Sequence, residues 1–275
     1  MTIAGRNRIL IFGICVTGIA LIGALFGCGA VIAHKLLTSA PEGVNHSFWL
    51  LRQPFFVYNN YAKMIGIASL PLIALVILIS TFVLFEKTHA LEISFFSLFV
   101  FSLSAEAFQL FFPLQRLYPL LTIFLAPLTR LLLFFRFFAC LSLLASSLFA
   151  HKTFTRKTWS IIFLLSFMSF SLARTIPVNT ADTPSFLLFS QSYRYLLYSF
   201  NGVICALAVV SFLFVGIYRS IPEYRQAALW LLTVLLAHTV LLYAGSWFFS
   251  VIGIAALTFG LFFFIRAIHR FYLWQ

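Results

Sequence analysis

Charged side chains are scarce in this sequence, and acidic ones are the scarcest. Asp, Glu, Lys and Arg make up 9% of the 275 residues, and only 6 residues are acidic. A soluble domain has about 25% charged residues. The composition therefore excludes an ordinary soluble domain.

Apolar residues take the place of the missing charges. They make up 63% of the sequence and include 36 Phe. Several runs of about 20 residues carry almost no charge, which is the length that a helix needs to cross a bilayer. The runs are continuous and do not alternate every second residue, as barrel strands would. The sequence therefore predicts an all-α, polytopic helical bundle in the lipid bilayer.

Motifs of soluble enzymes are also missing. The sequence contains no GxSxG, P-loop, GxGxxG or HExxH pattern. No two cysteines form a CxxC motif, so neither a zinc site nor a disulfide framework is predicted. All four lie in apolar runs, where a free thiol behaves as a small hydrophobe: Cys15, Cys28, Cys140 and Cys205. We expect no metal and no cofactor, and we favour a protein that is not an enzyme.

Eight apolar runs predict eight transmembrane helices. They cover residues 9–33, 64–85, 91–112, 118–150, 158–177, 195–217, 227–244 and 246–265. Gly245 and Ser246 permit a turn between the last two, which would otherwise form one helix of about 58 Å, roughly twice the hydrocarbon thickness. We expect one membrane domain with three parts: an N-terminal anchor helix or signal-like segment (1–36), an extracytoplasmic aromatic loop (37–63) and a seven-helix bundle (64–266).

The basic residues predict the orientation of these spans. The formal net charge is +12, but the 18 Lys and Arg never form a run of five or more. A nucleic-acid-binding protein would gather them on one face, so we expect no nucleic-acid partner. With both termini cytoplasmic, 10 basic residues lie inside and 6 outside, as the positive-inside rule requires. The 10 are Arg6, Arg8, Lys87, Lys152, Arg156, Lys157, Arg219, Arg225, Arg266 and Arg270, and the 6 are Lys35, Arg52, Lys63, Arg116, Arg174 and Arg194. We expect a bacterial-type inner (cytoplasmic) membrane.

The first apolar segment fits either an uncleaved helix or a lipoprotein signal. "LFGC" (25–28) resembles the bacterial lipobox, in which Cys28 would be lipidated, although Phe26 is bulkier than that pattern accepts. The apolar stretch continues to Ala33 and exceeds the roughly 7–15 residues of a signal h-region. We favour the uncleaved helix. The following 37–63 loop is rich in aromatic residues, which suits the head-group region, with a lid over a ligand site as the alternative.

Glu106 lies within the apolar run "SLSAEAFQLFF" (102–112) although acidic residues are so few. Ser102, Glu106 and Gln109 are spaced four and three residues apart, so they share one helix face. At 1.5 Å per residue, Glu106 should lie about 9 Å below the outer surface. An isolated charge within a span costs about 3 kcal/mol, so we expect a partner of opposite charge.

The next run, 118–150, supplies two candidate partners and is too long for one straight span. A break at Pro127 would leave 118–127 as an interfacial or re-entrant piece and about 130–150 as the membrane core. Arg130 would then snorkel to the outer surface, whereas Arg136 would lie about 9 Å deep, level with Glu106. We predict a Glu106–Arg136 pair, which is either a structural clamp or a ligand or ion site.

Three further polar residues are candidates for the same site: Asn201, His238 and Arg174. His238 is the one histidine in mid-span, where a hydrogen-bonded packing role is the alternative. A cationic outer vestibule for an anionic ligand or lipid head group is a further hypothesis, with solvated loop charges as its alternative. Its members would be Arg116, Arg130, Arg174 and Arg194.

Two classes of function fit these features. Seven helices that begin outside and end inside resemble, in layout, the membrane domains of bacterial seven-helix receptors with diverse intracellular modules. This resemblance implies a sensory or signal-transducing membrane module, which would have to work with membrane or cytoplasmic partner proteins. The alternative is a small transporter, or a membrane subunit of a transport or export complex, with a discontinuous helix at "APLTR" (126–130) near Glu106. An intramembrane enzyme acting on lipid ranks last, because such enzymes need at least two converging acid–base or metal-binding groups. We expect no second carboxylate or His at the depth of Glu106, and Glu92 lies near the opposite surface.

Overall fold

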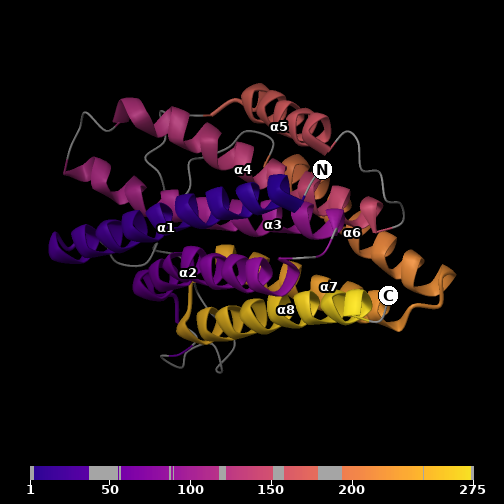
Figure 1. The fold of residues 1–275 in the computed structure, drawn as a ribbon. Helices are drawn as coiled ribbons and strands as arrows, with labels where there is room; N and C mark the ends of the chain where they lie inside the picture. The colour runs from indigo at the N-terminus through magenta and orange to yellow at the C-terminus, as the bar shows by residue number, and fades with distance from the viewer. Residues whose placement is uncertain are drawn as a thin grey trace.

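The computed structural model describes residues 3–36, 55, 57–86, 88, 90–117, 122–150, 158–178, 194–243 and 245–273. Within these residues the chain forms long helices that pack side by side (Figure 1). They are α1 (Ile3–Ala33), α2 (Asn60–Phe85), α3 (Leu91–Ser104), the 3₁₀ helix η2 (Ala105–Arg116), α4 (Thr122–Phe149), α5 (Thr158–Thr175), α6 (Arg194–Tyr218), α7 (Pro222–Tyr243) and α8 (Trp247–Leu273). In the described chain, 8 helical segments are long and apolar enough to cross a membrane, with α3 and most of η2 forming one of them. The predicted all-α polytopic bundle is confirmed.

The turn between α7 and α8 is as predicted. The Ser246 hydroxyl caps α8 by accepting a hydrogen bond from the Phe249 amide at 3.4 Å. The Asn59 amide donates to the Gly245 carbonyl, which ties the start of α2 to this turn. A Cβ at Gly245 would lie 2.1 Å from the Tyr58 ring, so only glycine fits there. The two segments are therefore separate spans that form an antiparallel hairpin.

Several helix limits differ from the predicted ones, among them the start of α2 and the end of α8. α2 begins at Asn60, and the Asn59 side chain caps it by accepting a hydrogen bond from the Tyr61 amide at 2.8 Å. Residues 60–63 are therefore helical, whereas 37–54 and 56 of the predicted aromatic loop lie outside the described residues. At the other end of the chain, α8 continues to Leu273 and carries Arg266 and Arg270 on its last turns.

The span that contains Glu106 changes its helix type part-way. It is α-helical to Ser104 and continues as a 3₁₀ helix of 12 residues to Arg116. Because 3₁₀ runs longer than three or four residues are uncommon, this is the most irregular backbone in the described part of the bundle. Pro113 lies within it, but α2 and α4 continue as α-helices through Pro71 and Pro127, so proline alone does not explain the change.

The predicted break at Pro127 is wrong. α4 runs from Thr122 to Phe149 without interruption, and residues 118–121 lie outside the described part. Pro127 lies in the second turn of α4, where it removes one backbone hydrogen bond near the helix end. Proline in a transmembrane helix is tolerated when its surroundings satisfy the freed groups. The discontinuity therefore lies in η2, one span earlier than the sequence suggests.

α3 and η2 lie at the centre of the bundle, and α5 lies at its edge. Along the most apolar stretch of each span, 78% of the residues are buried in α3–η2 but only 17% in α5. α3 contacts α1, α2 and α4, whereas α5 packs against α4 (Figure 1). The most buried span is thus the one that carries Glu92 and Glu106.

α1 is an integral part of this bundle. It packs against α2, α3 and η2, with Leu10 in the main core and Ala24 and Val31 in a second apolar cluster. Near its start, Arg6 donates hydrogen bonds to the Thr88 and Glu86 carbonyls. The first turn of α1 and the last turn of α8 lie at the same end of the bundle, where both chain termini are found (Figure 1). The uncleaved helix that we favour and lipidation of Cys28, its alternative, both stay predictions.

Candidate functional site

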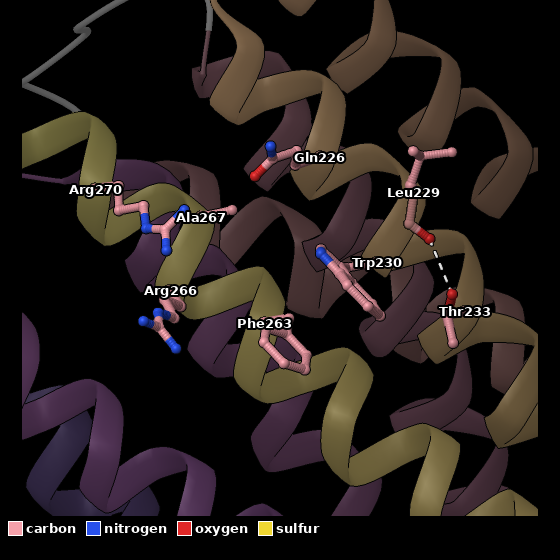
Figure 2. Close-up of a pocket in the computed structure, with 8 residues that line it drawn as sticks. All are labelled: Gln226, Leu229, Trp230, Thr233, Phe263, Arg266, Ala267 and Arg270. Atoms are coloured by element: carbon pink, nitrogen blue, oxygen red, sulfur yellow. Dashed lines mark hydrogen bonds between the residues drawn. The ribbon is translucent and has the colours of Figure 1, made fainter.

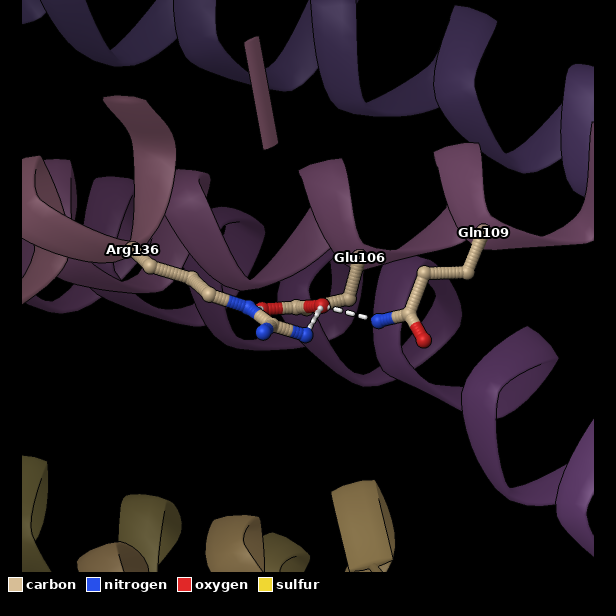
Figure 3. A network of polar contacts seen from close by, with 3 residues as sticks. All are labelled: Glu106, Gln109 and Arg136. Atoms are coloured by element: carbon tan, nitrogen blue, oxygen red, sulfur yellow. Dashed lines mark hydrogen bonds and ion pairs between the residues drawn. The ribbon is translucent and has the colours of Figure 1, made fainter. Parts of the chain in front are cut away.

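The predicted partners Glu106 and Arg136 are in direct contact. Arg136 Nε donates to Glu106 Oε1 at 2.7 Å, and Nη2 donates to Oε2 at 2.8 Å, so the pair is bidentate (Figure 3). The two side chains are only 9% and 4% exposed. Fork-to-fork pairs of this kind are strong and fix orientation as well as charge.

Gln109 completes this network from the far side of Glu106 (Figure 3). Its side-chain amide donates to Glu106 Oε2. In a 3₁₀ helix, residues three apart lie directly above one another, so η2 places Gln109 and Glu106 in line. The predicted third member, Ser102, lies on α3 and bonds back to the Leu98 carbonyl at 2.8 Å. The helix type therefore determines which neighbour reaches the carboxylate.

The ion pair lies in the wall of a cavity of about 450 Å³. The cavity lies between α3–η2, α4, α6 and α7, and most of its wall is apolar. Its polar members are Ser102, Glu106, Arg136, Tyr198, Asn201, His238, Thr239 and Tyr243, together with the thiols of Cys140 and Cys205. Helices that are far apart in the sequence thus converge on one polar cluster at the depth of Glu106.

Two of the predicted candidates, Asn201 on α6 and His238 on α7, belong to this wall. Within the described residues, Asn201 Oδ1 and His238 Nε2 are buried and have no hydrogen-bond partner. Leaving a buried polar atom unpaired costs about 1–3 kcal/mol. His238 is also close enough to interact electrostatically with Glu106 and Arg136. The cluster therefore has unused hydrogen-bonding capacity beside a charge-balanced pair.

The other candidates lie elsewhere. Gln109 is fully buried behind Glu106 and does not line the cavity. The side chains of Arg130 and Arg174 are exposed and are not among the lining residues either. The side chains of Arg116 and Arg194 fall outside the described part, so the cationic vestibule stays a prediction.

The cavity has an open side between α6 and α7. Four apolar or aromatic lining residues are also well exposed at the protein surface: Val210, Leu232, Leu236 and Tyr243. In a membrane this surface faces acyl chains, because exposed apolar side chains of a span contact lipid. The cavity thus opens sideways, towards the bilayer.

Two cysteines from different helices meet in the cavity wall. Cys140 on α4 and Cys205 on α6 have their Sγ atoms 3.5 Å apart, close enough for a weak hydrogen bond. Sequence spacing could not show this contact, because 65 residues separate the two thiols. Both remain free thiols and behave as polarizable packing groups.

A second buried carboxylate was not recognised from the sequence. Glu92, in the first turn of α3, is 2% exposed. Both of its oxygens accept a hydrogen bond from the Tyr224 hydroxyl at 3.0 Å. Tyr272 lies close enough to interact electrostatically with the same carboxylate. Ser146 on α4 donates to the Glu92 backbone carbonyl at 2.8 Å. The available signal was the acidic residue at the start of an apolar run, but no spacing relates it to tyrosines more than 130 residues later.

The chain is similar to an uncharacterized protein of Treponema pallidum (strain Nichols). The two are 26% identical over 348 residues, in an alignment that covers 100% of each chain. No family model matches the chain, and no solved structure matches it. The relative's name states no activity, so the function can be inferred only from the chemistry of the cavity. The chain is a multi-pass membrane protein with a polar cluster inside its helical bundle.

Proposed function

We propose that the protein is a small membrane transporter that takes a lipid-like amphiphile from the bilayer and holds its polar head group beside Glu106 and Arg136. The observation that carries this proposal is the cavity of about 450 Å³ with an ion pair in an otherwise apolar wall. Ligand pockets commonly measure about 300–1,000 Å³ and combine apolar walls with a few placed polar groups. The Glu106–Arg136 pair thus acts as a binding element as well as a structural one.

The expected head group is zwitterionic or neutral. Glu106 and Arg136 already balance one another, so a ligand with a net charge would be buried without a counter-charge, which is costly. Asn201 Oδ1 is an acceptor without a partner among the described residues, and His238 Nε2 is a second unpaired atom. An ammonium–phosphate head group, such as that of phosphatidylethanolamine, offers both donors and acceptors to these groups.

The open side of the cavity explains how a large amphiphile could use a small site. Only the head group would enter between α6 and α7, and the acyl chains would remain in the bilayer beside Leu232 and Leu236. The irregular η2 backbone at the cavity adds further support. Irregular backbone at membrane depth is found where it is buried in protein or lines a cavity, and transporters use broken helices at their binding sites.

The test is lipid translocation in proteoliposomes. A fluorescent NBD-labelled phosphatidylethanolamine is incorporated in both leaflets, and dithionite then bleaches only the molecules that reach the outer leaflet. Wild-type protein should accelerate bleaching of the inner pool, and Gly202→Leu should slow it at least about tenfold. Gly202 lines the cavity at its exposed side and has no atom within 4 Å of its Cβ position, so leucine meets no clash there and should narrow the opening.

Gly18→Leu is the matched control. Gly18 lies in α1, away from the cavity, and also has no atom within 4 Å of its Cβ position. This variant should translocate the probe as fast as the wild type. Wild-type vesicles that match protein-free vesicles, or equal rates for both glycine variants, would count against a lipid substrate at this cavity.

A sensory module is the second candidate. Two helices, α3 and α7, contribute residues both to the cavity and to the hydrogen bond between Glu92 and Tyr224. A ligand in the cavity that moves either helix would therefore change the contacts of Glu92. Such a module would bind the probe without moving it across the membrane, and it would need a partner protein. Binding of the probe that is sensitive to Gly202→Leu, without translocation, would favour this function over transport.

A further inference from the structure

A second hollow lies at the opposite end of the bundle from the turn between α7 and α8. It is a groove of about 580 Å³ between the first turns of α7 and the last turns of α8 (Figure 2). Its lining residues are Gln226, Leu229, Trp230, Thr233, Phe263, Arg266, Ala267 and Arg270. None of them lines the cavity at Glu106, so the groove is a separate feature.

The groove has a cationic end and an aromatic floor. Arg266 and Arg270 are four residues apart on α8, so they lie on the same face, and both side chains are exposed (Figure 2). Trp230 and Phe263 stack deeper in the groove, with ring centroids 4.7 Å apart and an interplanar angle of 20°. Like charges at this spacing repel one another slightly in an isolated helix. Within the described residues, neither arginine has a salt-bridge or hydrogen-bond partner, so the charge is uncompensated.

We propose that this groove binds an anionic phospholipid, with the phosphate held by Arg266 and Arg270 and an acyl chain lying over Trp230 and Phe263. Charge complementarity identifies the occupant, because guanidinium groups bind phosphate in a bidentate manner. Trp230 lies eight residues into α7, about 12 Å from the start of the helix, which is a depth at which an acyl chain contacts the protein. Basic pockets between transmembrane helices are known to bind anionic head groups. The apolar floor distinguishes a lipid from free phosphate, which would make no use of it.

The groove and the cavity therefore differ in the charge that they can accept. The cavity carries a neutralised pair, whereas the groove carries two positive charges without a described counter-charge. This inference does not depend on the proposed transport, because no residue is shared between the two sites. A protein that translocates nothing would still bind an anionic lipid here.

The test uses the full-length protein purified in detergent and native mass spectrometry. Dioleoyl phosphatidylglycerol and dioleoyl phosphatidylcholine are added at equal concentrations, and the bound lipid is counted. The wild type should retain phosphatidylglycerol about tenfold more tightly than phosphatidylcholine, and Arg266→Gln/Arg270→Gln should lose this preference. Equal retention of the two lipids by the wild type, or an unchanged preference in the variant, would overturn the proposal.

Two further variants keep the result interpretable. Arg8→Gln/Arg219→Gln removes two exposed charges outside the groove and should keep the preference for phosphatidylglycerol. Arg266→Lys/Arg270→Lys keeps the charge and should keep a weaker preference, so its complete loss would contradict a site based on charge. Inorganic phosphate at millimolar concentration should not displace the lipid. Displacement would assign the groove to free phosphate and overturn the lipid as its occupant.

Discussion

Glu106 and Glu92 lie on the same span, yet the protein holds the two carboxylates in opposite ways. Glu106 accepts two hydrogen bonds from one guanidinium, whereas Glu92 accepts from the Tyr224 hydroxyl and has Tyr272 nearby. About 20 Å of helix separates them. Among the described residues no cation forms a salt bridge with Glu92, which lies instead in the first turn of α3, where the helix dipole favours negative charge.

Two equally buried carboxylates can therefore lose very different amounts of stability when a partner is removed. Removing one member of an ion pair leaves a full charge buried without a partner, which costs about 3–5 kcal/mol. Removing the Tyr224 hydroxyl from Glu92 takes away a neutral donor and strands no opposite charge, so it should cost less. Substitutions at the two carboxylates and at their partners test this difference.

Glu106→Gln should destabilise the protein by about 3 kcal/mol, because Arg136 loses its only salt bridge within the described chain and stays buried. Equilibrium unfolding in mixtures of SDS and mild detergent measures this change in the free energy of unfolding. The double variant Glu106→Gln/Arg136→Met removes the stranded charge and should recover most of the loss. A double variant that is less stable than the single one would show that the pair is not the source of the effect.

Tyr224→Phe should cost about 1–2 kcal/mol, because the hydroxyl contacts both oxygens of Glu92 and the ring itself is retained. The same unfolding measurement applies. Tyr218→Phe is the control, since Tyr218 is exposed at the end of α6, and its change should be close to zero. A loss of stability as large as that of Glu106→Gln would show that the two carboxylates do not differ in this respect.

Glu92→Gln should cost about 1 kcal/mol, because glutamine has the same shape and keeps one acceptor oxygen for the tyrosines. Its rate of NBD-lipid translocation should equal that of the wild type, since Glu92 does not line the cavity. Glu106→Gln should lower this rate. Equal rates for the two glutamine variants would remove Glu106 from the proposed binding site.

Ser146→Ala should have the smallest measurable effect, about 0.5–1 kcal/mol, because it removes one hydrogen bond from α4 to the Glu92 carbonyl. Ser102→Ala is its counterpart near Glu106 and should be nearly neutral, since that hydroxyl bonds only within its own helix. Unfolding free energies of the two variants side by side test whether the bond between helices matters. Identical values would show that it does not.

The level of Arg136 relative to Glu106 could be predicted, and the order of the helices around the bundle could not. Counting residues placed Arg136 level with Glu106 on consecutive spans, and the two side chains do meet. The same counting could not place Asn201 and His238 at the cavity. Their helices come later in the chain, and the spacing of residues along the sequence does not show which helices are neighbours in a bundle. The break assigned to Pro127 was wrong for a related reason, since the backbone around a proline depends on its packed neighbours.

Composition and the length of the apolar runs were enough to predict a polytopic helical membrane protein and a nearby cation for the buried carboxylate. These follow from length and composition, since apolar runs of about 20 residues and isolated charges have few solutions in a bilayer. Four features became visible only in the tertiary structure: the 3₁₀ segment, the tyrosines around Glu92, the cavity and the groove. Each of these depends on which helix faces are brought together, and packing between distant segments determines those contacts.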